Sequence, residues 1–190
     1  MPVCGYGLQK RETEDKYNMR FIGFYDYTVI LTYFSVISAF LGMVFAHKGV
    51  FGAAMLCLFL SGFCDAFDGT VARTKKNRTE DEKAFGIQLD SLCDVVSFGA
   101  APAFACYCMG MDTVLGVAIL CAYCVCAVIR LAFFNVQEAK RQQVESGCNK
   151  YYRGLPVTSS SIIFPLFYLL RPLLPGKVFV TVLHVLCALT

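Results

Sequence analysis

Four aspartates stand at helical spacings in an otherwise apolar part of the chain: Asp65, Asp68, Asp90 and Asp94. The first two are three residues apart and the last two are four apart, so each pair shares one face of a helix. Packing the two helices together would bring four carboxylates into one small space. Such charges cannot all remain ionised unless cations join them, and carboxylates hold Mg²⁺ together with a substrate phosphate. The spacing therefore predicts a two-metal site that handles a phosphate ester.

Small residues and one arginine share the faces that carry the aspartates. Gly69, Ala72 and Arg73 follow the first pair, and Gly86 precedes the second. Small side chains let a bulky ligand lie against the helix backbone, and the arginine offers a two-pronged cation for phosphate. The alternative is a solvated helix end with aspartate at an N-cap. That alternative explains Asp90, but not the first pair, which ends its helix where the helix dipole disfavours anions.

The composition is that of a membrane protein. Of the 190 residues, 57% are hydrophobic and 16% are charged, whereas an average soluble domain has about 25% charged residues. We therefore expect an all-α, polytopic membrane helix bundle that contacts membrane lipid. The net charge of +3 is too small to indicate nucleic acid binding. Most of the eleven cysteines lie in apolar runs, which favours packing between helices over a disulfide framework.

About six apolar segments must position the four aspartates. We expect them at 27–46, 50–74, 85–109, 114–134, 155–170 and 178–189. A span needs about 20 residues, so the last segment is short for one. Pro102 lies inside the third segment and is expected to kink it. Residues 1–26 are polar and of mixed charge, which predicts a cytoplasmic or interfacial N-terminal segment before a membrane domain at 27–190.

The basic residues predict the orientation of the segments. Thirteen Lys and Arg fall in the N-terminal segment and in the connections after the second and fourth segments, and three fall on the opposite side. This bias places the N-terminus and the aspartates on the cytoplasmic side of, we expect, the plasma membrane. Arg130 lies near the end of the fourth segment, where it either snorkels to the interface or faces the site. The serines at 159, 160 and 161 are either helix-packing residues or substrate contacts, and packing is favoured.

The two faces together resemble the signature of the CDP-alcohol phosphotransferase family, DxxDGxxAR followed by GxxxDxxxD. Every signature residue is present, at 65–73 and 86–94. Twelve residues separate the arginine from the second glycine, where the family usually has eight, and the extra four fall in the polar loop. Within the family, LDSLCDVVSFGAAPA at 89–103, RLAFFN at 130–135 and RGLP at 153–156 resemble segments of the integral-membrane phosphatidylserine synthases.

The resemblance implies transfer of a phosphatidyl group from CDP-diacylglycerol to L-serine, with two divalent cations, Mg²⁺ or Mn²⁺, and a homodimer. Another acceptor, such as glycerol phosphate or inositol phosphate, is the first alternative, because the signature serves the shared CDP-lipid half. A cation transporter is the second. It would place carboxylates near the bilayer midplane in repeated halves, and no internal repeat stands out.

The resemblance also implies a role for each signature residue. The metal ligands would be Asp65, Asp68, Asp90 and, beside the second ion, Asp94, which would also act as general base. The CDP-lipid pocket would be lined by Asp68, Gly69, Ala72, Arg73 and Gly86. For the serine carboxylate, chemistry and position suggest the cations of Arg130 and Arg153, with Asn135 as a polar neighbour.

Overall fold

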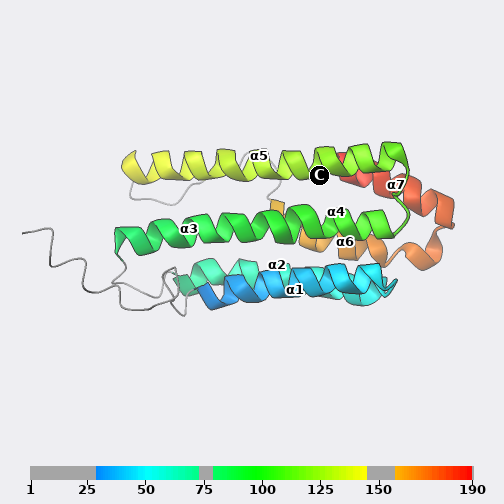
Figure 1. Cartoon of the computed structure of the whole chain (residues 1–190), viewed down its shortest axis with the longest axis horizontal. Helices are drawn as coiled ribbons and strands as arrows, with labels where there is room; N and C mark the ends of the chain where they lie inside the picture. The colour runs from blue at the N-terminus through cyan, green and yellow to red at the C-terminus, as the bar shows by residue number, and fades with distance from the viewer. Residues whose placement is uncertain (1–28, 73–78, 145–156, 190) are drawn as a thin grey trace, which may run out of the picture.

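The computed structural model of the protein describes residues 29–72, 79–144 and 157–189. Within these ranges every regular element is helical, which confirms the predicted all-α class (Figure 1). The elements in chain order are α1 (Ile30–His47), α2 (Phe51–Ala72), α3 (Glu80–Asp94), the π-helical η2 (Val95–Ala100), α4 (Ala101–Cys108), α5 (Val114–Val144), the short turn η3 (Val157–Ser159), α6 (Ser160–Tyr168), the short turn η4 (Arg171–Leu173) and α7 (Gly176–Leu189).

Four helical stretches of the described chain are long and apolar enough to cross a membrane. They are Ile30–His47, Phe51–Asp68, Ala84–Cys108 and Val114–Gln137. The α6 and α7 segments are apolar but shorter. Large apolar side chains face outward, among them Phe34 at 59% and Phe40 at 61% exposure. Outward apolar faces on helices of spanning length indicate an integral membrane protein.

The hairpin of α1 and α2 is built on small residues. Its turn passes through Gly49, whose φ of 76° lies in the left-handed region that glycine adopts without strain. The buried face of α1 consists of Thr32, Ser35, Ala39, Gly42 and Ala46. A Cβ added at Gly42 would lie only 3.2 Å from Cys57 Cβ, so the two backbones approach closely. Small residues at the contact are typical of packed membrane helices.

A second close approach joins α2 to α6 at Gly62, where an added Cβ would overlap the side chain of Ser161. We expect Gly62→Ala to destabilise the protein by about 1–3 kcal/mol, because overpacking forces one helix away from the other. Thermal unfolding of the detergent-solubilised protein measures the effect. Gly52→Ala is the matched control on α2, since its Cβ would meet nothing within 4 Å. A Gly62→Ala protein that melts at or above the wild-type temperature would contradict this account.

The helix that carries Asp90 and Asp94 begins at Glu80, five residues before the predicted start. The reason is a capping box: Glu82 N–H donates to Thr79 Oγ1 at 3.2 Å, and Thr79 N–H donates to Glu82 Oε2 at 3.0 Å. These bonds satisfy amide groups that would otherwise lack partners at a helix start. The charged connection predicted to extend to residue 83 is therefore shorter than expected.

The kink predicted at Pro102 is not seen as a change of direction, and the backbone irregularity there is the π-helical segment η2 (Val95–Ala100). In Figure 1, α3 and α4 continue in one direction through it as a single rod. The N–H of Ala101 donates to Val96 O, five residues back, which is the π-helical pattern. Pro102 follows immediately and has no amide hydrogen to donate. The irregularity in the backbone thus lies between Asp94 and Pro102.

The helix α5 runs to Val144, ten residues past its predicted end at 134. The polarity of the added sequence NVQEAKRQQV predicts a connection and not a helix. The sequence is rich in Glu, Ala, Lys, Arg and Gln, which are strong helix formers. The end of the apolar run therefore marks the end of the membrane segment and not the end of the helix.

The hydrophobic core lies where α4, the start of α5, α6 and α7 meet. Phe98, Cys106, Met111, Phe164 and Leu183 are almost completely buried there. The rings of Phe167 and Phe179 stack at 4.8 Å between centroids and join α6 to α7. In Figure 1, α6 and α7 lie along the α4 half of the bundle and not along the α3 half. The aspartates belong to the α2 and α3 segments outside this core.

Candidate active site

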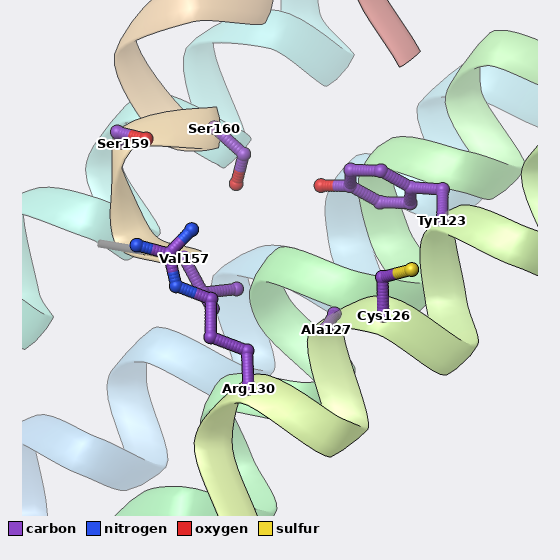
Figure 2. Close-up of a pocket in the computed structure, with 7 residues that line it drawn as sticks. All are labelled: Tyr123, Cys126, Ala127, Arg130, Val157, Ser159 and Ser160. Carbon is purple, nitrogen blue, oxygen red and sulfur yellow. The ribbon is translucent and has the colours of Figure 1, made fainter. Parts of the chain in front are cut away.

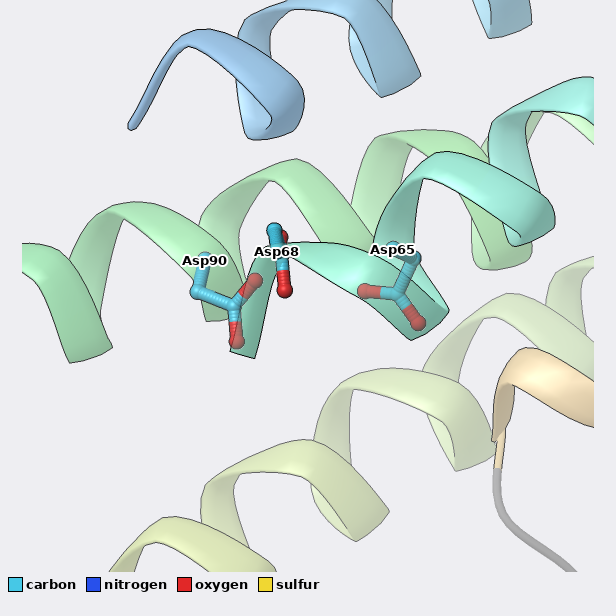
Figure 3. Close-up of side chains that lie close together, drawn as sticks. All are labelled: Asp65, Asp68 and Asp90. Atoms are coloured by element: carbon cyan, nitrogen blue, oxygen red, sulfur yellow. The ribbon is translucent and has the colours of Figure 1, made fainter. Parts of the chain in front are cut away.

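Three aspartates converge at the contact of α2 with α3. Each of Asp65, Asp68 and Asp90 offers a carboxylate oxygen, and these oxygens lie within 4.8 Å of one another (Figure 3). Asp68 is buried with 8% exposure, and the other two are half-buried. The tertiary structure thus brings together the two helix faces that the sequence spacing predicted. The arrangement can hold a cation between two helices.

Asp94 lies one helical turn beyond Asp90 and extends the cluster. It is 9% exposed, and its side chain is within hydrogen-bonding contact of Asp65. Asp68 and Asp90 are in the same kind of contact. Carboxylates this close repel one another unless a proton or a cation lies between them. All four predicted carboxylates therefore belong to one electrostatic unit.

One oxygen of this unit is well suited to a metal ion. Asp90 Oδ1 is buried and has no hydrogen-bond partner among the described residues. Leaving a buried acceptor unpaired costs about 1–3 kcal/mol, and more when the group is charged. An all-carboxylate donor set is the kind that hard divalent cations prefer. The residues present therefore fit a divalent cation.

A row of buried hydroxyls on α1 supports the carboxylates. Thr32 Oγ1 donates to Asp68 Oδ2 at 3.0 Å. One turn further along, Ser35 Oγ lies 2.8 Å from Ser61 Oγ and donates to Ser97 Oγ at 3.4 Å. Sequence analysis did not single out these residues. The available signal was polar residues at three-residue spacing, at 32, 35 and 38, on one face of an apolar helix.

A pocket of about 270 Å³ lies between α5 and the start of α6. It is lined by Tyr123, Cys126, Ala127, Arg130, Val157, Ser159 and Ser160 (Figure 2). Figure 2 shows the Arg130 guanidinium extending toward Val157, while the hydroxyls of Tyr123 and Ser160 point toward one another. Arg130 was a predicted acceptor residue, and Ser159 and Ser160 were favoured for packing. The pocket combines one cation with hydroxyl groups, which suits a small polar molecule with a negative charge.

The pocket wall touches the helix that carries Asp94. Tyr123 Oη donates to the carbonyl oxygen of Phe98 at 2.6 Å, and Ser160 Oγ donates to the same oxygen at 3.5 Å. Phe98 stands four residues after Asp94, in η2. The pocket and the aspartate cluster therefore adjoin the same helical rod, which consists of α3, η2 and α4.

Asn135, an acceptor candidate from the sequence, contacts Ser91 of α3. Its Nδ2 donates to Ser91 Oγ at 2.7 Å, and Ser91 Oγ lies 3.1 Å from Asn135 Oδ1. Ser91 is the neighbour of Asp90 in the chain, so the pair joins α5 to α3 beside the cluster. Asn135 is not among the residues that line the pocket. An acceptor role for Asn135 stays a prediction.

The remaining candidates lie at the edges of the described chain. Gly69 and Ala72 are in the last turns of α2, and Gly86 lies in α3, one turn before Asp90. Arg73 and Arg153 fall outside the described residues. Their predicted contacts with the lipid phosphates and with serine stay predictions.

Comparison with known proteins matches this chain to a family. A model of the CDP-alcohol phosphatidyltransferase family matches residues 27–190. The CDP-diacylglycerol–serine O-phosphatidyltransferase of Saccharomyces cerevisiae is 41% identical over 115 residues, which are 59% of this chain and 40% of the yeast protein. The enzyme of the same name from Bacillus subtilis is 40% identical over 90 residues, 46% of this chain and 49% of its own length.

An archaeal relative matches over a longer range. The archaetidylserine synthase of Methanothermobacter thermautotrophicus is 31% identical over 141 residues, which are 74% of this chain and 56% of that protein. The chain therefore spans about half the length of the curated relatives it matches. The names of the yeast and Bacillus relatives give serine as the acceptor, and the archaeal name gives a serine lipid.

Proposed function

Because the chain belongs to the CDP-alcohol phosphatidyltransferase family, we propose that it transfers a phosphatidyl group from CDP-diacylglycerol to the hydroxyl of L-serine and releases CMP. The observation that carries the proposal is the convergence of Asp65, Asp68 and Asp90, with a buried oxygen of Asp90 left unpaired. The arginine pocket against the same helical rod supports a small charged acceptor. The serine-specific names of the relatives support L-serine over glycerol phosphate and inositol phosphate.

In this proposal the carboxylates hold two divalent cations, Mg²⁺ or Mn²⁺. Asp65, Asp68 and Asp90 are the main ligands, and Asp94 adjoins the second ion. Bound cations of this kind stabilise negative charge on the attacking and leaving oxygens of a phosphoryl transfer. The CDP-lipid lies beside Gly69 and Ala72 of α2 and Gly86 of α3, where small residues admit the nucleotide. Arg73, which lies outside the described residues, binds a phosphate in this proposal.

Asp94 acts as the general base on the acceptor. Its carboxylate takes the proton from the serine hydroxyl, and the serine oxygen forms a bond to the lipid-side phosphorus. The bond between that phosphorus and the oxygen of CMP breaks, and CMP leaves with the electron pair. A base must lie within hydrogen-bonding reach of the hydroxyl it deprotonates. Asp94 belongs to the cluster and stands four residues before Phe98 on the rod that the pocket touches, and this position supports the role.

Arg130 binds the carboxylate of serine in the pocket. A guanidinium forms two parallel hydrogen bonds with a carboxylate, which fixes both the position and the orientation of the acceptor. Arg153 and Asn135 remain further acceptor candidates. The serine hydroxyl then points away from Arg130 toward the aspartates.

We further propose that the site faces the cytoplasm from the plasma membrane and that the enzyme is a homodimer. The excess of Lys and Arg on one side of the predicted segments supports the orientation. The division into an interfacial segment at 1–26 and a membrane domain at 27–190 belongs to the same proposal. Cytoplasmic access lets a soluble amino acid and a membrane lipid reach the site together.

The test is to incubate the purified protein with CDP-diacylglycerol and Mg²⁺ or Mn²⁺ and to measure CMP release with and without L-serine. We expect release that depends on both the cation and serine. Release that ignores serine but responds to glycerol 3-phosphate or inositol phosphate would reject the serine assignment and keep the family. The absence of CMP release with every alcohol tested would reject the transferase proposal and favour the cation transporter.

The hydroxyl of Thr32 gives a second prediction, which concerns metal affinity. We expect Thr32→Val to weaken Mn²⁺ binding about 10- to 100-fold, the usual effect of losing a partner that orients a ligand carboxylate. Mn²⁺ titration followed by electron paramagnetic resonance measures it without substrate. Ser38→Ala is the matched control on α1, because Ser38 Oγ donates to the backbone carbonyl of Cys57 at 2.7 Å and not to a carboxylate. Equal affinities for the wild type and Thr32→Val would remove Thr32 from the site.

A further inference from the structure

One backbone carbonyl in the core has lost its helical partner. Pro102 has no amide hydrogen, so the carbonyl oxygen of Phe98, four residues earlier, lacks the donor that an α-helix would provide. Phe98 is completely buried, with 0% exposure, and water cannot replace the donor there. Tyr123 Oη fills the gap at 2.6 Å, and Ser160 Oγ approaches at 3.5 Å. The proline and the tyrosine therefore form one structural unit across two helices.

The tyrosine is held firmly in place. Its side chain is 7% exposed, and its ring meets that of Phe164 edge to face, with 6.1 Å between centroids and 88° between planes. Tyr123 and Arg130 are seven residues apart on α5, which places them on one face of that helix. Both line the pocket between α5 and α6. The hydroxyl thus connects the wall of the pocket to the π-helical segment η2.

The segment η2 begins directly after Asp94. A π-helical segment carries extra backbone length, so its position along and around the helix axis is not set by α-helical hydrogen bonds alone. A shift of η2 would move the preceding turn, which holds the Asp94 carboxyl. The hydrogen bond from Tyr123 to Phe98 O, at 2.6 Å, is shorter than the one from Cys124 Sγ on α5 to Gly99 O in the same segment, at 3.6 Å. It therefore restrains Asp94 relative to the pocket.

We propose that Tyr123 is a positioning residue of this active site: through Phe98 O it sets the placement of the Asp94 carboxyl relative to the acceptor bound beside Arg130. This inference rests on the proposed function, since it assumes that Asp94 and the pocket act on one acceptor. Tyr123 itself does not donate to the acceptor, because a phenol has one hydrogen to donate and Phe98 O already receives it. This positioning role predicts that removing the Tyr123 hydroxyl lowers kcat and leaves the binding of serine unchanged.

The experiment compares Tyr123→Phe with the wild type in serine-dependent CMP release. We expect kcat to fall about 10- to 100-fold, which is the loss that a misplacement of about 1 Å causes, while KM for serine and for CDP-diacylglycerol changes little. Tyr107→Phe on α4 is the matched control, since that side chain is 46% exposed, and it should keep the wild-type kcat. A raised serine KM at unchanged kcat would make Tyr123 a substrate contact and overturn the inference. A lowered melting temperature at unchanged kcat would make the hydroxyl merely structural and also overturn it.

A second variant tests the pairing with the proline. Pro102→Ala restores an amide donor for the carbonyls of this turn, so Tyr123→Phe should lower kcat much less in that background than in the wild type. An equal loss in both backgrounds would show that the hydroxyl does not act through the freed carbonyl. If the wild type proves active only with another acceptor alcohol, the serine proposal fails, and the same kcat ratios measured with that alcohol still decide the role of Tyr123.

Discussion

Replacing Asp94 with asparagine is expected to lower kcat for serine-dependent CMP release by about 10²- to 10⁴-fold, the range that a general base contributes. Asparagine keeps the shape of the side chain but cannot accept the proton of the serine hydroxyl. Asp94 is buried at 9% exposure, in contact with Asp65. The assay is CMP release at saturating serine and CDP-diacylglycerol, with Mn²⁺ affinity measured in parallel.

Two comparisons separate the base from the metal ligands. Asp90→Asn should lose Mn²⁺ affinity together with kcat, because it removes the negative charge and one oxygen of a carboxylate whose Oδ1 is buried and unpaired among the described residues. Asp94→Asn should retain most of the Mn²⁺ affinity while kcat collapses. Asp112→Asn, an exposed position in the turn between α4 and α5, should match the wild type in both. If Asp94→Asn kept kcat within about tenfold of the wild type, a base contribution of this size would be excluded and another group would have to be the base.

Arg130→Ala should raise the KM for serine about 10- to 100-fold and leave kcat within a few-fold of the wild type. The loss of a charge-assisted hydrogen bond costs about 1.5–3 kcal/mol, and each 1.4 kcal/mol corresponds to about a factor of ten in binding. The effect falls on KM because the serine carboxylate keeps its charge throughout the reaction. Steady-state kinetics with serine as the varied substrate measure it.

A second substitution separates the charge of the Arg130 side chain from its two-pronged hydrogen-bonding geometry. Arg130→Lys keeps the cation but loses the two-pronged geometry, so its serine KM should fall between those of the wild type and Arg130→Ala. Arg171→Ala is the control: this exposed arginine stacks on Phe51 and Tyr168, at 5.2 and 5.6 Å from their ring centroids, and is not part of the pocket. An unchanged serine KM in Arg130→Ala would remove Arg130 from the acceptor site.

Local sequence patterns accounted for the helices and the carboxylates. Apolar runs of spanning length predicted α1, α2, the α3–α4 rod and α5, because burial in lipid requires continuous apolar sequence and internally satisfied backbone. The spacing of three and four residues predicted that each aspartate pair shares a face. The helix ends were less predictable: α3 begins early because of a capping box, and α5 outlasts its apolar run.

The sequence by itself thus determined which helices form, that their aspartate faces would meet, and which chemistry those carboxylates suit. The tertiary structure alone decided which neutral residues support them. The bonds from Thr32 to Asp68, from Asn135 to Ser91 and from Tyr123 to Phe98 O join residues 36, 44 and 25 positions apart. Helical periodicity relates residues within a few turns of one another, and contacts between helices depend on how the helices pack. A local pattern can mark a polar residue on an apolar helix face, as at Thr32, but it does not identify a partner this distant, so only the packed bundle reveals the pair.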